Sequence, residues 1–166
     1  MSYRKSVIKS VQYASITMTG VVSQTATLTT PVDVSYSVVS LLGWTTTSGN
    51  ITADRNAMRV ELTDTSTVTA YANTIDATPK VAYFEVIEYF PFALLQAVQP
   101  LRLTTATATI TAVGAKAVIV RGGFTTADVT TQAQGWDGGA TLTDATTVTR
   151  IGDRSPTVAC AVVDFK

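Results

Sequence analysis

The 166-residue chain contains no histidine and a single cysteine, and charged residues make up only 14% of it. Without histidine, the commonest general base at neutral pH and the commonest metal ligand are both missing. One thiol cannot form an internal disulfide. Because Cys160 stands in the small apolar stretch Thr-Val-Ala-Cys-Ala-Val-Val, we expect it in a buried strand, packed as an apolar group.

Other absences narrow the function further. Neither a Gly-x-Ser-x-Gly nor a Gly-x-x-x-x-Gly-Lys motif occurs, so the sequence predicts no enzyme, no cofactor and no metal site. Twelve basic residues balance twelve acidic ones, which leaves no net field to attract nucleic acid or an anionic membrane. No run of about 18 apolar residues occurs, and residues 1–9 lack an apolar segment, so we expect a soluble product made in the cytoplasm.

What the chain has in abundance is threonine, roughly a fifth of its residues, together with valine and alanine. Apolar residues alternate with polar ones over 58–62 and again over 67–72, and Asp64-Thr65-Ser66 between them is typical of a tight turn. This stretch predicts a β-hairpin. Further strands are predicted at Val11–Met18, Gln24–Thr30, Ser35–Trp44 and Val81–Phe90.

The hairpin sequence occurs twice, as ELTDTSTVT at 61–69 and as TLTDATTVT at 141–149. Other segments match in the same order: Ser10–Gln12 with Ala97–Gln99, Thr25–Thr29 with Thr107–Thr111, Gly43–Thr46 with Gly123–Thr126, and Val86–Tyr89 with Val162–Phe165. We therefore predict an all-β protein of two tandem antiparallel β-sandwich, jelly-roll-like domains of about eighty residues each. The first spans 1–90 and the second 91–166, with 91–100 as an apolar connector and entry strand.

The connector, Tyr89 to Ala97, is too apolar for a free linker. A domain of about eighty residues buries little surface, so it is expected to rest on a neighbour. The interface candidates are Phe90, Phe92, Leu94 and Leu95. Ordinary core packing within one chain is an equal alternative.

Acidic side chains offer little chemistry. Asp64 and Asp144 fall in the repeated turns, where a structural role is favoured over catalysis. Glu85 and Glu88 are an odd number of residues apart on one strand, so they point to opposite faces and are expected as solvent or interface charges.

The segment 125–139 differs most between the two copies. Its Gln134, Trp136 and Asp137 could stack on a sugar ring and bind its hydroxyls, as recognition loops on β scaffolds do. The alternative, which we favour, is that Trp136 covers the end of the sandwich.

The phrases Ile8–Gln12, Thr25–Thr29, RVELTDTSTVTA at 59–70 and FEVIEY at 84–89 resemble a small β module of structural proteins in tailed bacteriophages. Tyr13-Ala14 and Pro100-Leu101 stand where that family usually has Arg-Gly after Ser-Val-Gln. The resemblance implies a virion component without enzymatic activity or cofactor, assembled in the host cytoplasm.

We therefore expect a virion structural protein that forms a trimer or hexamer and attaches to the tail, neck or fibre apparatus. Two modules in each chain would let a trimer meet a sixfold tail. A capsid decoration protein and a glycan-binding module for a host surface are the alternatives.

Overall fold

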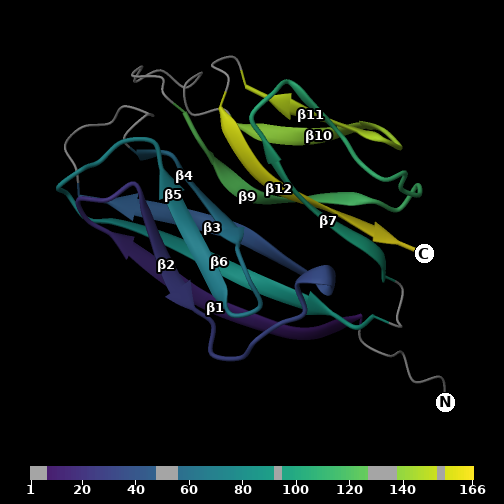
Figure 1. Cartoon of the computed structure of the whole chain (residues 1–166), viewed down its shortest axis with the longest axis horizontal. Coiled ribbons are helices and arrows are strands. Elements are labelled where there is room, and N and C mark those ends of the chain that lie inside the picture. The colour runs from purple at the N-terminus through teal and green to yellow at the C-terminus, as the bar shows by residue number, and fades with distance from the viewer. Residues whose placement is uncertain (1–6, 48–55, 92–94, 127–137, 153–155) are drawn as a thin grey trace.

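The structure, a computed structural model, describes residues 7–47, 56–91, 95–126, 138–152 and 156–166. It is all-β, and the described strands pair in antiparallel fashion (Figure 1). The strands of the first half are β1 (Ile8–Met18), β2 (Ser23–Thr27), β3 (Ser37–Thr46), β4 (Met58–Leu62), β5 (Thr67–Ala72) and β6 (Lys80–Tyr89). Those of the second half are β7 (Leu95–Leu103), β8 (Thr107–Thr109), β9 (Val118–Thr125), β10 (Gly139–Asp144), β11 (Thr147–Ile151) and β12 (Thr157–Phe165).

The pairing order of the first half recurs in the second. In the first half β1, β6 and β3 form one sheet, and β2, β5 and β4 pair in that order. In the second half β7, β12 and β9 pair in the same way as β1, β6 and β3, and β8, β11 and β10 pair as β2, β5 and β4. Below, residues at the same place in the two patterns are called matched.

Hydrogen bonds recur at matched positions as well. The Gln12 side chain binds the main-chain N–H and C=O of Thr30, and Gln99 binds those of Thr111. The N–H of Leu28 donates to the carbonyl of Ser66, as the N–H of Ile110 does to that of Thr146. Each half therefore ties the segment after its second strand to its hairpin turn in the same way.

Buried side chains gather in three clusters. The first lies between the two sheets of the first half and includes Ile16, Phe84 and Val68. The second lies largely in the second half and includes Cys160 and Val148, which confirms the predicted apolar setting of the thiol. The third lies between the halves, and its buried members are Val38, Tyr89, Leu95, Ala161 and Val163. We call the whole contact between the two halves, of which this cluster is a part, the seam.

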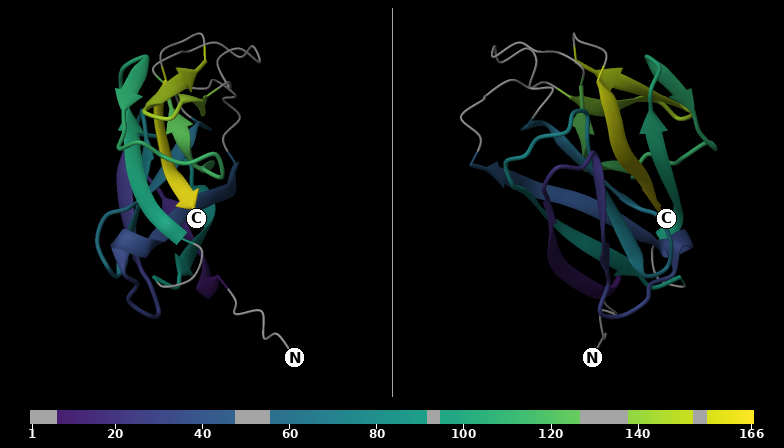
Figure 2. Two further views of the ribbon diagram at one scale, coloured as in Figure 1. Left: turned by 90° about the vertical axis from the view of Figure 1, so that its right-hand side faces the viewer. Right: turned by 60° about the vertical axis from the view of Figure 1, so that its left-hand side comes forward.

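One connection was not expected from the sequence. Strand β4 of the first half pairs with β9 of the second at Arg59 and Gly123, which extends the β2–β5–β4 sheet into β9–β12–β7. The two halves therefore share a six-stranded sheet. Figure 2 shows the second half beside one end of the first, with β10 and β11 far from β1.

The predicted strands are present, with several ends shifted by one to three residues, and two of these shifts have a visible cause. Strand β2 ends at Thr27, before the predicted Thr30, because the N–H groups of Leu28 and Val32 bond to the turn after β4. Strand β3 begins at Ser37, because Val34–Tyr36 forms a 3₁₀ turn (η1) that the Asp33 carboxylate caps through the N–H of Ser35. The predicted hairpin is β4 and β5.

Candidate functional site

The structure places one of the four predicted interface residues, Leu95, in the seam. Leu95 begins β7 and is buried with Val38 and Val163, whereas Phe90 is 43% exposed just beyond β6. Phe92 and Leu94 lie outside the described residues, as do Gln134, Trp136 and Asp137 of the predicted recognition loop.

Aromatic rings join the halves near two points of the seam. Trp44 of β3 and Phe124 of β9 meet edge to face with centroids 6.5 Å apart. Tyr89 of β6 and Phe165 of β12 meet in the same way at 6.0 Å. Edge-to-face packing adds specific geometry to the burial of these large side chains.

Glycine allows the backbones to approach between these points. A Cβ on Gly122 would lie 2.6 Å from the carbonyl oxygen of Val60 and 3.1 Å from the Cβ of Ala159. Gly123 has φ +92°, a conformation that favours glycine, and a Cβ there would clash with the main chain of β4. The Gly-Gly pair is therefore required by the contact between β4 and β9.

A cluster of polar side chains around Arg59 links the two halves beside the apolar part of the seam. The guanidinium of Arg59, which is 5% exposed, donates to Glu61 at 2.7 Å and to the hydroxyl of Thr125 at 2.7 Å. It also lies over the ring of Tyr71, 4.3 Å from the centroid. The Arg59–Thr125 bond crosses from the first half to the second, so this cluster fixes their relative position.

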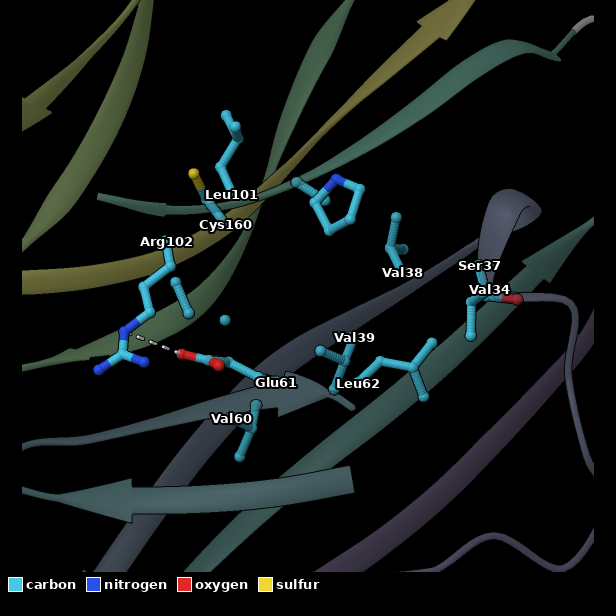
Figure 3. A pocket seen from close by; sticks show the side chains of 14 residues that line it. Val34, Ser37, Val38, Val39, Val60, Glu61, Leu62, Leu101, Arg102 and Cys160 are labelled. Carbon is cyan, nitrogen blue, oxygen red and sulfur yellow. Dashed lines mark ion pairs between the residues drawn. The ribbon is translucent and has the colours of Figure 1, made fainter. Parts of the chain in front are cut away.

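A cavity of about 200 Å³ lies between the halves at this point. In Figure 3, Arg102 and Glu61 face each other across it, with their ion-pair atoms 3.9 Å apart. Aliphatic groups form much of the remaining wall, including Val38, Val39 and Leu62. The cavity offers an apolar wall and one ion pair, a lining suited to packing.

Cys160 borders this cavity but supplies no nucleophile. Its side chain packs in the second-half core, and burial raises the pKa of its thiol to about 11. Since the thiolate is the reactive form, the thiol is unreactive near neutral pH.

The predicted turn carboxylates occupy matched turns. Asp64 accepts hydrogen bonds from the N–H and hydroxyl of Ser66, and Asp144 accepts the same pair from Thr146. These bonds lower the pKa of both carboxyls below the ordinary value, and in each case the bond from the backbone N–H has the largest effect on the pKa. The expected structural role is what the geometry supports.

The structure contradicts the sequence-based expectation for Glu88. It was expected as a solvent or interface charge, but it is 3% exposed and accepts bonds from Lys9, Ser10 and the N–H of Asp33. Burial would raise its pKa, but the bonds to Lys9 and the Asp33 N–H outweigh that effect and lower it. The matched Asp164 accepts from the N–H of Gly114, which is matched to Asp33.

Neither a metal centre nor a membrane helix is found in the described part of the chain. No group of three or more acidic or cysteine side chains there is arranged to hold a metal ion. None of the described segments is a helix long and apolar enough to cross a bilayer.

No family model, curated protein or solved structure matches this chain. The close approach of β4 to Gly122 and Gly123 was missed in the sequence, although one signal was there. At the matched position of the third strand, the first half has Leu42 and the second has Gly122, a change that packing on a new neighbour explains.

Proposed function

We propose that this protein is a non-enzymatic, oligomeric structural component of a tailed-bacteriophage virion, attached to the tail, neck or fibre apparatus. In this proposal the chain is a tandem pair of jelly-roll-like β-sandwich modules, 1–90 and 91–166. The repeated pairing order and the repeated glutamine and turn bonds support the tandem pair.

The observation that carries the non-enzymatic role is the use of acidic side chains at matched positions. Asp64 and Asp144 hold turns, while Glu88 and Asp164 tie the segment before the third strand to the last strand of each half. A carboxylate whose oxygens already accept hydrogen bonds is a poor general base, and the lowered pKa values of Asp64, Glu88 and Asp144 weaken these three further as bases. These groups are engaged in architecture, as expected of a building block.

An exposed apolar surface supports the oligomeric part. The outer face of the β1–β6–β3 sheet carries Tyr13, which is 70% exposed, and Leu42, which is 54% exposed. Large exposed apolar side chains on one face of a sheet favour an interaction surface.

The test is immuno-electron microscopy of phage particles whose genome encodes the chain, with antibodies raised against the purified protein. Labelling of the tail, neck or fibres is the expected result. Labelling spread over the capsid would support the decoration alternative instead. Particles without label, from cells in which the chain is abundant, would overturn the virion role.

A glycan array with a Trp136→Ala control tests the third candidate. We expect that the wild type and the Trp136→Ala variant give the same response on the array, with no glycan bound specifically by the wild type alone. A specific, Trp136-dependent signal would replace the building-block role with receptor recognition.

A further inference from the structure

We propose that the cavity between the halves binds a small organic carboxylate. Its apolar body, about the size of a benzene ring, would lie against the aliphatic wall, and its carboxylate would bind the guanidinium of Arg102. This inference goes beyond the proposed function and does not rest on it. It starts from the shape of the seam around the contact between β4 and β9.

The cavity lies where β4 and β9 separate. The register of these two strands contains one pair, Arg59 with Gly123. Twisted strands that meet at one pair diverge on either side of it. Glu61 and Leu62 continue along β4 and line the cavity, without a β9 partner among the described residues. The divergence therefore leaves room between the two halves.

The facing wall does not fill this room, because its side chains are small. Cys160 turns into the second-half core, so the alternation of β12 points its neighbours Ala159 and Ala161 toward the cavity. The matched residues of the first half are Tyr83 and Glu85, whose side chains are much larger. A tyrosine or a glutamate in place of these alanines would occupy the space. The second half therefore keeps the cavity open through its own sequence.

The volume suits a small molecule. The cavity has about 200 Å³. A dry apolar cavity of about 150 Å³ in another protein takes up benzene, whereas sites for drug-sized ligands begin at about 300 Å³. Val38 is 2% exposed and contributes to the aliphatic wall together with Val39 and Leu62. An apolar ring or a short chain would therefore leave water and bury its surface there.

The charged groups favour an anion. Glu61 accepts a hydrogen bond from Arg59 at 2.7 Å, so its charge is already compensated. Arg102 lies 3.9 Å from the same carboxylate, which is an ion pair beyond hydrogen-bond distance. Within the described part of the chain Arg102 donates no hydrogen bond, and its side chain is 55% exposed. Its planar guanidinium is therefore available to a carboxylate, which it can bind through two N–H groups.

The two kinds of wall are arranged for one amphipathic molecule. Figure 3 shows Arg102 and Glu61 together at one side of the cavity, with Val38, Val39 and Leu62 beyond them. A molecule seated there would touch β7 and β12 of the second half and β3 and β4 of the first. Because it would bind only when the halves are packed together, it would stabilise the folded chain.

The experiment is an NMR titration of the purified, isotope-labelled full-length chain with three probes of similar shape. Benzoate is the anion, benzamide the neutral analogue and benzylamine the cation. Benzoate should shift the main-chain amide signals of Leu62, Gly122 and Ala161, and saturate with a Kd of about 1 mM or lower. Benzamide should bind about tenfold more weakly, because it lacks the charge that Arg102 binds, and benzylamine more weakly still.

Variants separate the two parts of the site. Arg102→Gln should weaken benzoate binding about tenfold and leave benzamide binding unchanged. Arg121→Gln is the matched control, because this exposed arginine of β9 lies beside Gly139 and does not line the cavity. It should bind benzoate as the wild type does. Ala161→Leu should fill the cavity and abolish the binding of both probes, and Ala161→Val repeats this test if the leucine variant loses its native circular dichroism.

Four results would each overturn the inference. They are the absence of saturable shifts at the cavity, saturable shifts confined to other parts of the chain, benzylamine or benzamide binding as tightly as benzoate, and an Arg102→Gln variant that binds benzoate like the wild type. A further check is thermal unfolding. Benzoate should raise the unfolding temperature of the wild type, and this rise should disappear when Ala161 is enlarged.

Discussion

The indole of Trp44 and the ring of Phe124 meet edge to face, with centroids 6.5 Å apart and planes at 85°. Each follows the glycine of its half's third strand, so matched residues touch one another across the seam. Trp44 also packs against the buried clusters of both halves. The pair therefore couples the folding of one half to that of the other.

That coupling can be measured. Trp44→Leu and Phe124→Leu should each lower the free energy of unfolding by about 1–3 kcal/mol, because each removes buried ring surface. Together they should lose about 0.5–1.5 kcal/mol less than the sum, since the edge-to-face contact is removed only once. Urea denaturation of the wild type, the two single variants and the double variant completes this double-mutant cycle. Strict additivity would mean that the rings contribute only by burial.

Gly122→Ala tests the contact between β4 and β9. The added Cβ would lie 2.6 Å from a main-chain oxygen that cannot move alone, so we expect about 1–3 kcal/mol of destabilisation. Gly139→Ala is the control, because a Cβ there meets its nearest atom, in the Arg121 guanidinium, at an ordinary 3.6 Å. It should leave the free energy of unfolding within about 1 kcal/mol of the wild type. Equal effects in thermal or urea unfolding would rule out the steric argument.

The turn carboxylates predict a dependence on pH. Because the folded protein lowers the pKa values of Asp64 and Asp144, their stabilising effect is complete above the unfolded value. It is lost as the pH falls through the lower folded values. The double variant Asp64→Asn and Asp144→Asn should therefore lose less stability than the wild type between neutral and acidic pH, in urea melts at several pH values. An unchanged slope would show that these turns do not contribute to acid unfolding.

Cys160 should react only slowly with thiol reagents in the native state. Its pKa of about 11 and its burial leave almost no accessible thiolate at mildly alkaline pH. Labelling with a disulfide reagent should be slow in native buffer and fast in denaturant. Rapid stoichiometric labelling of the folded chain would show that the second-half core opens readily.

Much of the fold could be predicted because its determinants are local. The alternation in Met58–Leu62 and Thr67–Ala72 depends on one face of each strand being buried, whatever the neighbour is. Asp64 closes its turn with the N–H two residues later, a bond that needs no distant partner. The match of Leu-Thr-Asp at 62–64 and 142–144 predicted that this turn occurs twice, and both turns are present.

The seam could not be predicted in the same way. Glu88 was expected at the surface because its neighbours in sequence do not show that Lys9, Ser10 and the N–H of Asp33 converge on it. Gly122 was not singled out, because its requirement comes from the Val60 carbonyl, 62 residues earlier in the chain. Arg59 pairs with Thr125 over a similar separation.

By itself, the sequence determined an all-β chain with repeated strands, repeated turns and a buried thiol, because side-chain alternation and turn chemistry act between near neighbours. Only the tertiary structure decided which faces of the repeat are covered and which remain open. Covering Ala159 while exposing Tyr83 depends on how β4 meets β9, and that contact exists only after distant strands have been brought together.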